Sequence, residues 1–460
     1  MVINNFIENK QEKGLLKRVV LPVILLSLVS TLFIIFEGAE NIIYLGLIQL
    51  NCIIALYNLF ENQSRPYSLK KFVFLFIYVF FILANGVQFA HDSNVLTFSL
   101  LFNDSDYISF QIIVFFIQLF FVLFYRFPVI TPKFSIRNEA IVHSDKNIST
   151  PLLVILAIIS SFIIIAHYNF NLIQLFARGL TNEMLLEKGI EIQESSIAEE
   201  LIFTKIIRPI PWACFVIGFI SKKRKQILML LFILMLITIF PTGLDRNATA
   251  MYWIPIVVLV FSRIIKGNRF IWFMFISLFV IFPFFDNFRH FNGIIKFKID
   301  LAYLDSMNLD ASQLFMATIA TNTVTYGSQL LGAILFFVPR AIWPTKPIGS
   351  GHFLATSNGG WFTNVSMPFF SEGFINFGFL GILIFISIIA TVCSIADKKY
   401  WRSPLTLKSG YYLILLGAII FIMRGDLMSS FAFTVGIMLS YTLAVKITSI
   451  KVDYSVKKHL

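Results

Sequence analysis

Charged residues, cysteine and histidine are all scarce in this sequence. Of its 460 residues, 13% are charged, 3 are cysteine and 6 are histidine. Ordinary soluble domains carry about 25% charged residues, so this composition excludes a soluble fold. The cysteines lie within long apolar runs, and neither a CxxC pair nor a His/Cys cluster occurs. A disulfide framework and a metal site are therefore not expected.

Apolar residues dominate what remains. Hydrophobic residues make up 57% of the chain, and the mean hydropathy is +0.81. The apolar runs follow one another with so little between them that residues 1–460 are expected to form one all-α polytopic membrane domain. The first run lacks a small-residue cleavage site, so we interpret it as a retained span rather than a signal peptide. We predict about twelve spans, at residues 19–36, 41–60, 72–90, 108–125, 151–168, 206–220, 227–240, 248–262, 270–285, 367–395, 410–423 and 427–445.

Lysine and arginine are distributed unevenly between the connections of these spans. Alternate connections, counted from the N-terminus, together carry 26 of the 37 Lys and Arg residues. Because basic residues favour cytoplasmic loops, this pattern predicts that both termini are cytoplasmic. Membrane topology then accounts for most of the net charge of +12, and no nucleic-acid partner is expected.

Two arginines on the predicted outer side, Arg246 and Arg424, follow apolar runs of only about fourteen residues. A span needs about twenty residues, so both arginines should lie below the outer surface. Ionisable groups at that depth usually line a cavity or a path. Each arginine could pair with its sequence neighbour, Asp245 or Asp426. Alternatively, both could contribute to a shared anion site, since a guanidinium binds phosphate bidentately.

Two outward connections are long enough to carry structure of their own. The larger covers residues 286–366, and within it the short apolar run Leu330–Phe337 predicts an interfacial or re-entrant helix that is stopped by Pro339. The smaller, residues 169–205, has an acidic centre with periodic Leu and Ile, which favours an amphipathic helix lying over the membrane.

The segment P-R-A-I-W-P-T-K-P-I-G-S-G-H, residues 339–352, combines a rigid backbone with cationic and aromatic side chains. Arg340, Trp343 and Lys346 suit a phosphorylated sugar, because aromatic faces pack on sugar rings and cations bind phosphate. Trp and Lys also gather at membrane surfaces, so the segment could instead be an interface anchor. Its Gly-Ser-Gly run, residues 349–351, would let the backbone approach a ligand closely.

Glu372 and His352 are the candidate catalytic residues. Glu372 is expected near the outer end of a span, with Asn376 four residues further along the same helical face. It could act as a general base or as a salt-bridge partner that orients an arginine. His352 ranks second, because a lone histidine is more often structural than catalytic.

Four stretches of the chain resemble the bacterial oligosaccharide repeat-unit polymerases of the Wzy type, which build O-antigen and related surface polysaccharides. The longest runs from Phe337 to Leu383 (FVPRAIWPTKPIGSGHF … PFFSEGFINFGFLGIL). The others are P-T-G-L-D-R-N at 241–247, D-N-F-R-H at 286–290 and M-R-G-D-L at 423–427. In architecture the similarity covers most of the chain. It implies a GT-C-like fold in the bacterial inner membrane, with the active site on the periplasmic side.

The activity that the resemblance implies is transfer of a glycan from one undecaprenyl-diphosphate carrier to the repeat unit on another. Neither a cofactor nor a metal is expected, because arginine can stabilise the departing diphosphate. The implied diphosphate and substrate ligands are Arg246, Arg289, Arg340, Lys346, Arg424 and Trp343. Glu372 or His352 would deprotonate the acceptor hydroxyl. Related GT-C enzymes carry a catalytic acid in the first outer loop, where this chain has Glu37 and Glu40.

Other functions fit parts of the same pattern. A lipid-linked oligosaccharide flippase would have a similar number of spans, but internal repeats and short outer loops are expected of it. An O-antigen ligase uses the same chemistry with a different acceptor. An assembly protein would leave the sunken arginines unexplained. Expected partners are membrane lipid, the lipid-linked oligosaccharides, a chain-length regulator and a flippase.

Overall fold

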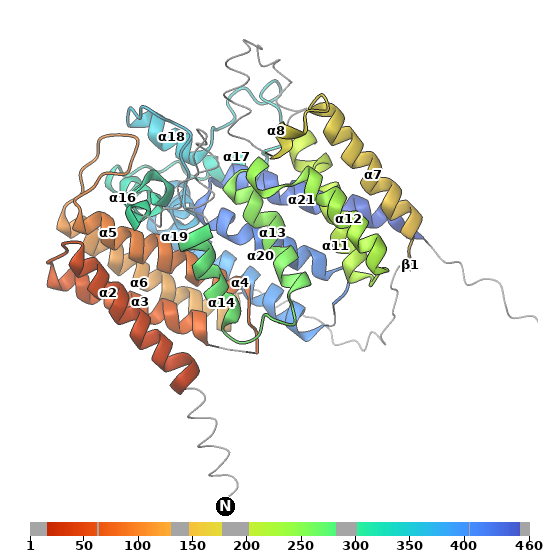
Figure 1. The fold of residues 1–460 in the computed structure, drawn as a ribbon. Coiled ribbons are helices and arrows are strands. Elements are labelled where there is room, and N and C mark those ends of the chain that lie inside the picture. The colour runs from red at the N-terminus through yellow and green to blue at the C-terminus, as the bar shows by residue number, and fades with distance from the viewer. Residues whose placement is uncertain are drawn as a thin grey trace, which may run out of the picture.

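The computed structural model describes residues 16–61, 64–129, 147–176, 202–281, 301–403 and 405–450, which form a bundle of helices (Figure 1). Two strands of two residues, β1 (Asn147–Ile148) and β2 (Ser449–Ile450), pair antiparallel. The main helices are α2 (Leu21–Phe36), α3 (Ile42–Phe60), α4 (Leu69–Phe76), α5 (Ala84–Ala90), α6 (Asp104–Arg126), α7 (Thr150–His167), α8 (Leu172–Phe176), α11 (Ile210–Ile220), α12 (Lys225–Thr238), α13 (Arg246–Val260), α14 (Arg269–Ile276), α16 (Ala311–Ala320), α17 (Ser328–Ile334), α18 (Ser350–Ser357), α19 (Phe369–Arg402), α20 (Ser409–Arg424) and α21 (Leu427–Thr448).

Nine helical segments among the described residues are long and apolar enough to cross a membrane. The prediction of a multi-pass all-α membrane protein is therefore confirmed. Three of the twelve predicted spans form helices that are too short to count by length: Arg246–Val260, Arg269–Val280 and Ser409–Arg424. The run at 227–240, predicted to be shorter than a full span, is longer than predicted. A 3-10 turn after α12 extends it to the 19-residue segment Lys225–Gly243, which is one of the nine.

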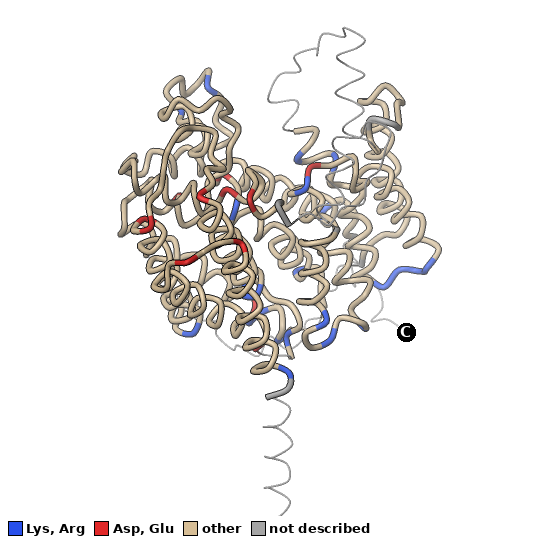
Figure 2. The backbone as a smooth tube through the Cα atoms, turned by 60° about the vertical axis from the view of Figure 1, so that its left-hand side comes forward, with Lys and Arg blue, Asp and Glu red and all other residues tan. Residues whose placement is uncertain are grey.

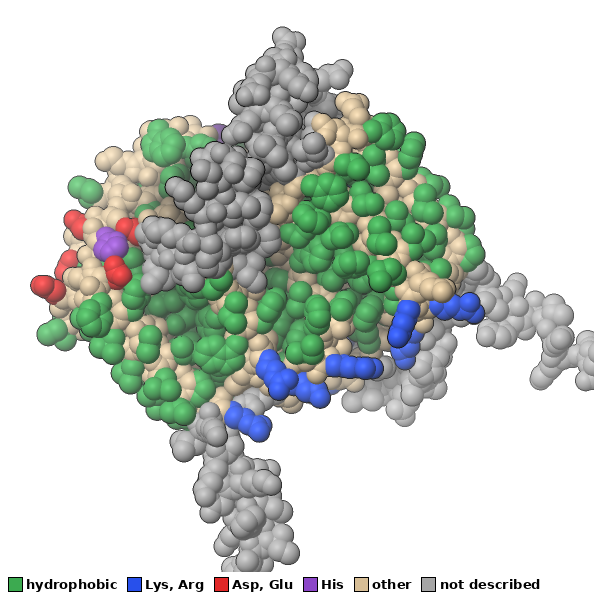
Figure 3. Space-filling model, in the orientation of Figure 1, with side chains coloured by type: hydrophobic (Ala, Val, Ile, Leu, Met, Phe, Trp, Pro, Cys, Tyr) green, Lys and Arg blue, Asp and Glu red, His purple; other side chains and the backbone are tan. Residues whose placement is uncertain are grey.

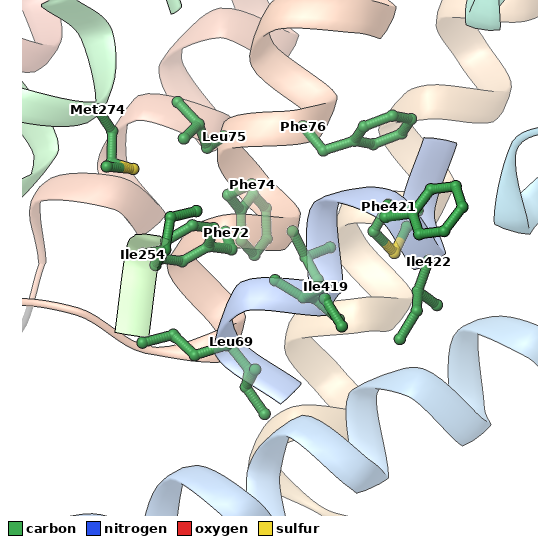
Figure 4. Close-up of a cluster of buried hydrophobic side chains, with 14 of the residues drawn as sticks. Leu69, Phe72, Phe74, Leu75, Phe76, Ile254, Met274, Ile419, Phe421 and Ile422 are labelled. Carbon is green, nitrogen blue, oxygen red and sulfur yellow. The ribbon is translucent and has the colours of Figure 1, made fainter. Parts of the chain in front are cut away.

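One continuous helical segment, Leu69–Ala90, forms the centre of the bundle. It comprises α4, the π-helical stretch η2 (Ile77–Leu83) and α5, and 94% of its apolar window is buried, against 28% for α7. Figure 4 shows Phe72 and Phe74 of α4 packed beside Ile254 of α13 and Ile419 of α20. Because lipid is as apolar as these side chains, close packing rather than exclusion of water holds such helices together.

Charged residues are separated along the bundle axis. Most Lys and Arg gather at one end, a smaller number lie elsewhere, and most Asp and Glu lie towards the other end (Figure 2). The surface between is largely apolar (Figure 3) and includes the exposed Ile155, Ile159 and Phe162 of α7. The basic end contains the start of α2 and the turn between α11 and α12. We refer to the opposite end as the acidic end.

The predicted single span at 367–395 is two helical pieces. Phe377 and Gly378 leave the helical conformation, and Gly378 has φ +63°. A Cβ atom on Gly381 would lie 1.9 Å from the carbonyl oxygen of Gly373, so these backbones are in contact. A straight helix would separate the two residues by about 12 Å. The arm formed by residues 369–376 therefore folds back on the helix that follows it.

The described part of the long outward connection, residues 301–366, is a folded cap rather than an extended loop. It contains α16, α17 and α18 at the acidic end (Figure 1). The side chains of Ser312 and Gln313 on α16 are fully buried. A short helix predicted at Leu330–Phe337 is observed as α17, shifted to Ser328–Ile334. It ends five residues before Pro339, so the predicted stop at this proline is wrong. The predicted amphipathic helix within 169–205 lies mostly outside the described residues.

Candidate functional site

Glu372 joins the beginnings of three helices at the acidic end. It lies on the first arm of α19 and is 1% exposed. Its Oε2 accepts a hydrogen bond from the hydroxyl of Ser350 at 2.7 Å. Its Oε1 accepts one from the backbone N–H of Leu427 at 3.0 Å. Since Ser350 begins α18 and Leu427 begins α21, Glu372 fixes both to α19.

A second carboxylate, Asp426, lies in the same junction. Its Oδ1 caps α21 by accepting from the N–H of Met428 at 3.0 Å. Its Oδ2 accepts from the N–H of Gly351 at 3.3 Å, and a Cβ on Gly349 would lie 2.6 Å from that oxygen. Burial raises the pKa of Asp426 above its usual range. The close approach predicted for residues 349–351 is thus made to a carboxylate of the chain itself.

Arg424 forms an ion pair with Asp310, the N-cap residue of α16, at 3.3 Å. The alternative in which Arg424 pairs with its neighbour Asp426 is therefore wrong. Burial raises the pKa of Asp310, whereas the charge of Arg424 acts to lower it. The Nε atom of Arg424 is buried and has no hydrogen-bond partner among the described residues. One donor of this guanidinium is thus left over.

Arg246 reaches towards the same part of the chain. It donates hydrogen bonds to the hydroxyl of Tyr303 and to Oδ1 of Asn308, both at 3.0 Å. Asp245 caps α13 through the N–H of Ala248 at 2.6 Å. Asn308 is two residues from Asp310, so their Cα atoms are no more than about 7.6 Å apart. Arg246 and Arg424 therefore contact one short stretch, residues 303–310, which we call the bridging segment.

Arg340 and Lys346 hold the shape of their own loop. The Arg340 guanidinium donates to the carbonyl oxygens of Lys346 at 2.7 Å and of Pro347 at 3.3 Å. The Lys346 ammonium donates to the carbonyl of Phe336 at 2.6 Å, and burial lowers the pKa of this lysine. Trp343, between them, is partly buried. The loop leads into Gly349 and thus to the Asp426 carboxylate.

His352 is the accessible member of the two catalytic candidates. It lies on α18, one residue after Gly351, and its side chain is exposed. Its ring forms no hydrogen bond with the described part of the chain. Glu372, by contrast, has both oxygens bonded to the protein. His352 is therefore accessible to a ligand, whereas Glu372 positions α18 against α21.

The loop between α2 and α3, which the sequence predicts to be the first outer loop, is fastened to the bridging segment by His91. The imidazole contacts Asp305 through Nδ1 and Glu37 through Nε2, each at 2.9 Å. Hydrogen bonds to these two carboxylates, Asp305 first, raise the pKa of His91. Glu37 is therefore engaged in this contact, whereas Glu40 lines a pocket beside it.

The structure thus gathers most of the predicted residues at the acidic end. Glu372 binds the starts of α18 and α21, α18 also carries the exposed His352, and Arg424 ends the helix just before α21. The bridging segment links Arg424 to Arg246. Arg289 lies outside the described residues. Sequence reasoning missed Asp310, and it placed Ser350 in the Gly-Ser-Gly run without foreseeing that its hydroxyl binds Glu372. The signal for Asp310 was its position just before the apolar run that becomes α16. Within the described ranges, no group of three or more His, Cys, Asp or Glu side chains could hold a metal ion.

Comparison with protein-family models, with curated proteins and with solved structures gives no match for this chain.

Proposed function

We propose that the protein is a glycosyltransferase that polymerises oligosaccharide repeat units carried on undecaprenyl diphosphate. The resemblance in sequence to Wzy-type polymerases suggests this chemistry, together with twelve spans and a GT-C-like arrangement. The observation that carries the proposal is the junction at the acidic end. There two buried carboxylates, Glu372 and Asp426, tie the start of α18, which carries the exposed His352, to the start of α21, three residues after Arg424. In the proposed reaction the acceptor hydroxyl attacks the anomeric carbon of the donor directly, so no side chain of the protein is needed as a nucleophile.

In the proposed reaction, His352 takes the proton of the acceptor hydroxyl as the new glycosidic bond forms at the anomeric carbon of the donor. The bond from that carbon to the diphosphate oxygen breaks, and undecaprenyl diphosphate leaves with the electron pair. Arg424 and Arg246 stabilise the negative charge that develops on it. The Arg424 side chain is 22% exposed, which leaves it accessible to a ligand. Glu372 keeps α18, and with it His352, in register with α21 through Ser350.

The proposed orientation places the basic end in the cytoplasm and the acidic end outside the inner membrane. The reason is the separation of charge along the bundle, since Lys and Arg favour cytoplasmic loops (Figure 2). The carboxylate junction and the two arginines then face the periplasm, where lipid-linked repeat units are joined. An O-antigen ligase would share this arrangement and differ only in its acceptor.

The experiment uses the full chain in lipid nanodiscs with an undecaprenyl-diphosphate-linked repeat unit and a chelator. Products are separated by gel electrophoresis. A ladder of several units that is lost in His352→Ala and Arg246→Ala supports the proposal. Trp361→Leu is the control. This exposed tryptophan follows α18 in the sequence, and its side chain makes no hydrogen bond in the described structure.

The result that contradicts the proposal is a single transfer to lipid A core without a ladder, which identifies a ligase. Movement of lipid-linked units across sealed vesicles without any new glycosidic bond identifies a flippase instead. A ladder that persists unchanged in both His352→Ala and Arg246→Ala leaves polymerisation standing but removes these residues from the mechanism.

A further inference from the structure

A pocket of about 390 Å³ opens at the acidic end, between the first outer loop and the start of α6. Pockets of roughly this size hold small ligands in other proteins. Its walls come from the loop after α2, the end of α5 and the turn before α6. The lining residues are Gly38, Glu40, Asn41, Phe89, Asp92, Phe102, Asn103, Asp104 and Tyr107. None of the residues assigned above to diphosphate binding is among them.

We infer that this pocket binds a neutral or amine-bearing sugar ring, the terminal sugar of the acceptor repeat unit. The identity of the ligand as an acceptor rests on the proposed function, whereas the class of ligand rests on the lining. Three of the nine lining residues are carboxylates, and none is Lys, Arg or His. A diphosphate or a uronic acid would be repelled there, because like charges at short range oppose binding.

Two of the carboxylates are free to accept hydrogen bonds from a ligand. The side chains of Glu40 and Asp92 bond to nothing in the described part of the chain, whereas Asp104 accepts from the Asn41 amide at 2.7 Å. Asn103 uses its side-chain oxygen to cap α6, which leaves its NH₂ group as a donor. Sugar hydroxyls and amines donate to carboxylates, and ring or hydroxyl oxygens accept from an amide. The pocket therefore offers the polar groups that a sugar needs.

The aromatic lining is held rigidly. Phe89 and Tyr107 pack edge to face with their centroids 5.1 Å apart, and Phe102 and Tyr107 do so at 6.1 Å. The Tyr107 hydroxyl accepts from the Gln313 amide at 3.3 Å, which fixes the ring against α16. Tyr107 itself is only 3% exposed and serves as the support. The partly exposed Phe89 and Phe102, fixed against it, provide the apolar wall for the C–H face of a sugar at little cost in conformational entropy.

The pocket is connected to the arginines through α16. Gln313, which holds Tyr107, lies three residues after Asp310, the partner of Arg424. Three residues of helix rise about 4.5 Å. A cation site is not the better interpretation, since the described carboxylates do not form a group that could hold a metal ion. One sugar in the pocket and a diphosphate at Arg424 would thus occupy adjoining regions of opposite charge preference.

The test measures sugar binding directly, by saturation-transfer NMR with the full chain in nanodiscs. The probes are glucosamine, N-acetylglucosamine and glucuronic acid. Glucosamine and N-acetylglucosamine should bind, with glucuronic acid at least about tenfold weaker. Asp92→Asn and Glu40→Gln should each weaken glucosamine binding about tenfold, the effect of losing one charge-assisted hydrogen bond. Trp361→Leu should bind as the wild type does, and the thermal unfolding of every variant confirms that it is folded.

Equal binding of glucuronic acid, or unchanged binding in both folded carboxylate variants, overturns the inference. The ladder assay separates this failure from failure of the proposed function. Sugars that bind in the wild type but not in Asp92→Asn, with no ladder from any substrate, leave the pocket standing and remove the polymerase. A wild-type ladder that is unaffected by Asp92→Asn, with no sugar binding detected, leaves the polymerase standing and excludes the pocket as a sugar site.

Discussion

The ion pair between Arg424 and Asp310 allows stability and activity to be separated. The side chains are 22% and 7% exposed, so Asp310 is the more deeply buried partner. Removing one member of a buried pair costs about 3–5 kcal/mol, and the partial exposure of Arg424 reduces this to roughly 2–3 kcal/mol for Arg424→Gln. Asp310→Asn leaves the charge of Arg424, which is the better solvated of the two, and should lower the free energy of unfolding by roughly 1–2 kcal/mol. The double variant Asp310→Asn/Arg424→Gln leaves neither charge, and its free energy of unfolding should lie within about 1 kcal/mol of that of the wild type.

Thermal unfolding of the purified protein in one detergent measures the cycle, and the ladder assay measures activity. We expect Arg424→Gln to unfold at a lower temperature and the double variant to recover most of the loss. The double variant should nevertheless form no ladder, because it lacks the guanidinium that we propose binds the diphosphate. An Arg424→Gln protein as stable as the wild type would refute the energetic argument. A fully active double variant would refute the role of Arg424 in the reaction.

Three further changes test the surrounding structure. Gly378→Ala should destabilise the protein by about 1–2 kcal/mol, because φ there is +63°, and thermal unfolding measures this against Gly46→Ala, whose added methyl meets open space. Ser350→Ala removes a donor from Glu372 and should cost about 1–3 kcal/mol, with the ladder assay showing reduced activity. His91, whose pKa is raised by its carboxylate partners, stabilises the fold fully below about pH 6.5, and this stability is lost as pH rises through the raised value. His91→Gln should abolish that part of the pH dependence of the unfolding temperature; an unchanged profile would exclude the histidine as its source.

The helical spans were the most predictable part of the fold. A run of about twenty apolar residues in a membrane protein has few alternatives to a helix, because unpaired backbone groups are costly in lipid. Periodicity could not show that 367–395 breaks in two. The break depends on the positive φ of Gly378 and on the contact between Gly373 and Gly381. Both are properties of the folded chain, and a glycine in an apolar run is equally compatible with a straight, closely packed helix.

The site was predictable in its composition and not in its pairing. Short apolar runs pointed to Arg246 and Arg424, and both lie where the bundle gathers its acidic residues. Their partners could not be inferred, because Asp310 is 114 residues from Arg424 and Asn308 is 62 from Arg246. Sequence neighbours are the natural guess for an ion pair. For Arg424 the guess failed because Asp426 is already engaged in capping α21 and accepting from Gly351.

The bridging segment has three anchors within eight residues, and this has a mechanical consequence. Asp305 is bonded to His91, Asn308 to Arg246 and Asp310 to Arg424. A shift of the first outer loop is therefore passed through His91 to the segment that sets the positions of both arginines. Gln313, three residues after the end of this segment, binds Tyr107 of the sugar pocket. A ligand in the pocket that displaced Tyr107 would therefore also displace the bridging segment. We therefore predict that occupation of the proposed sugar pocket and placement of the two guanidiniums are coupled through residues 303–313.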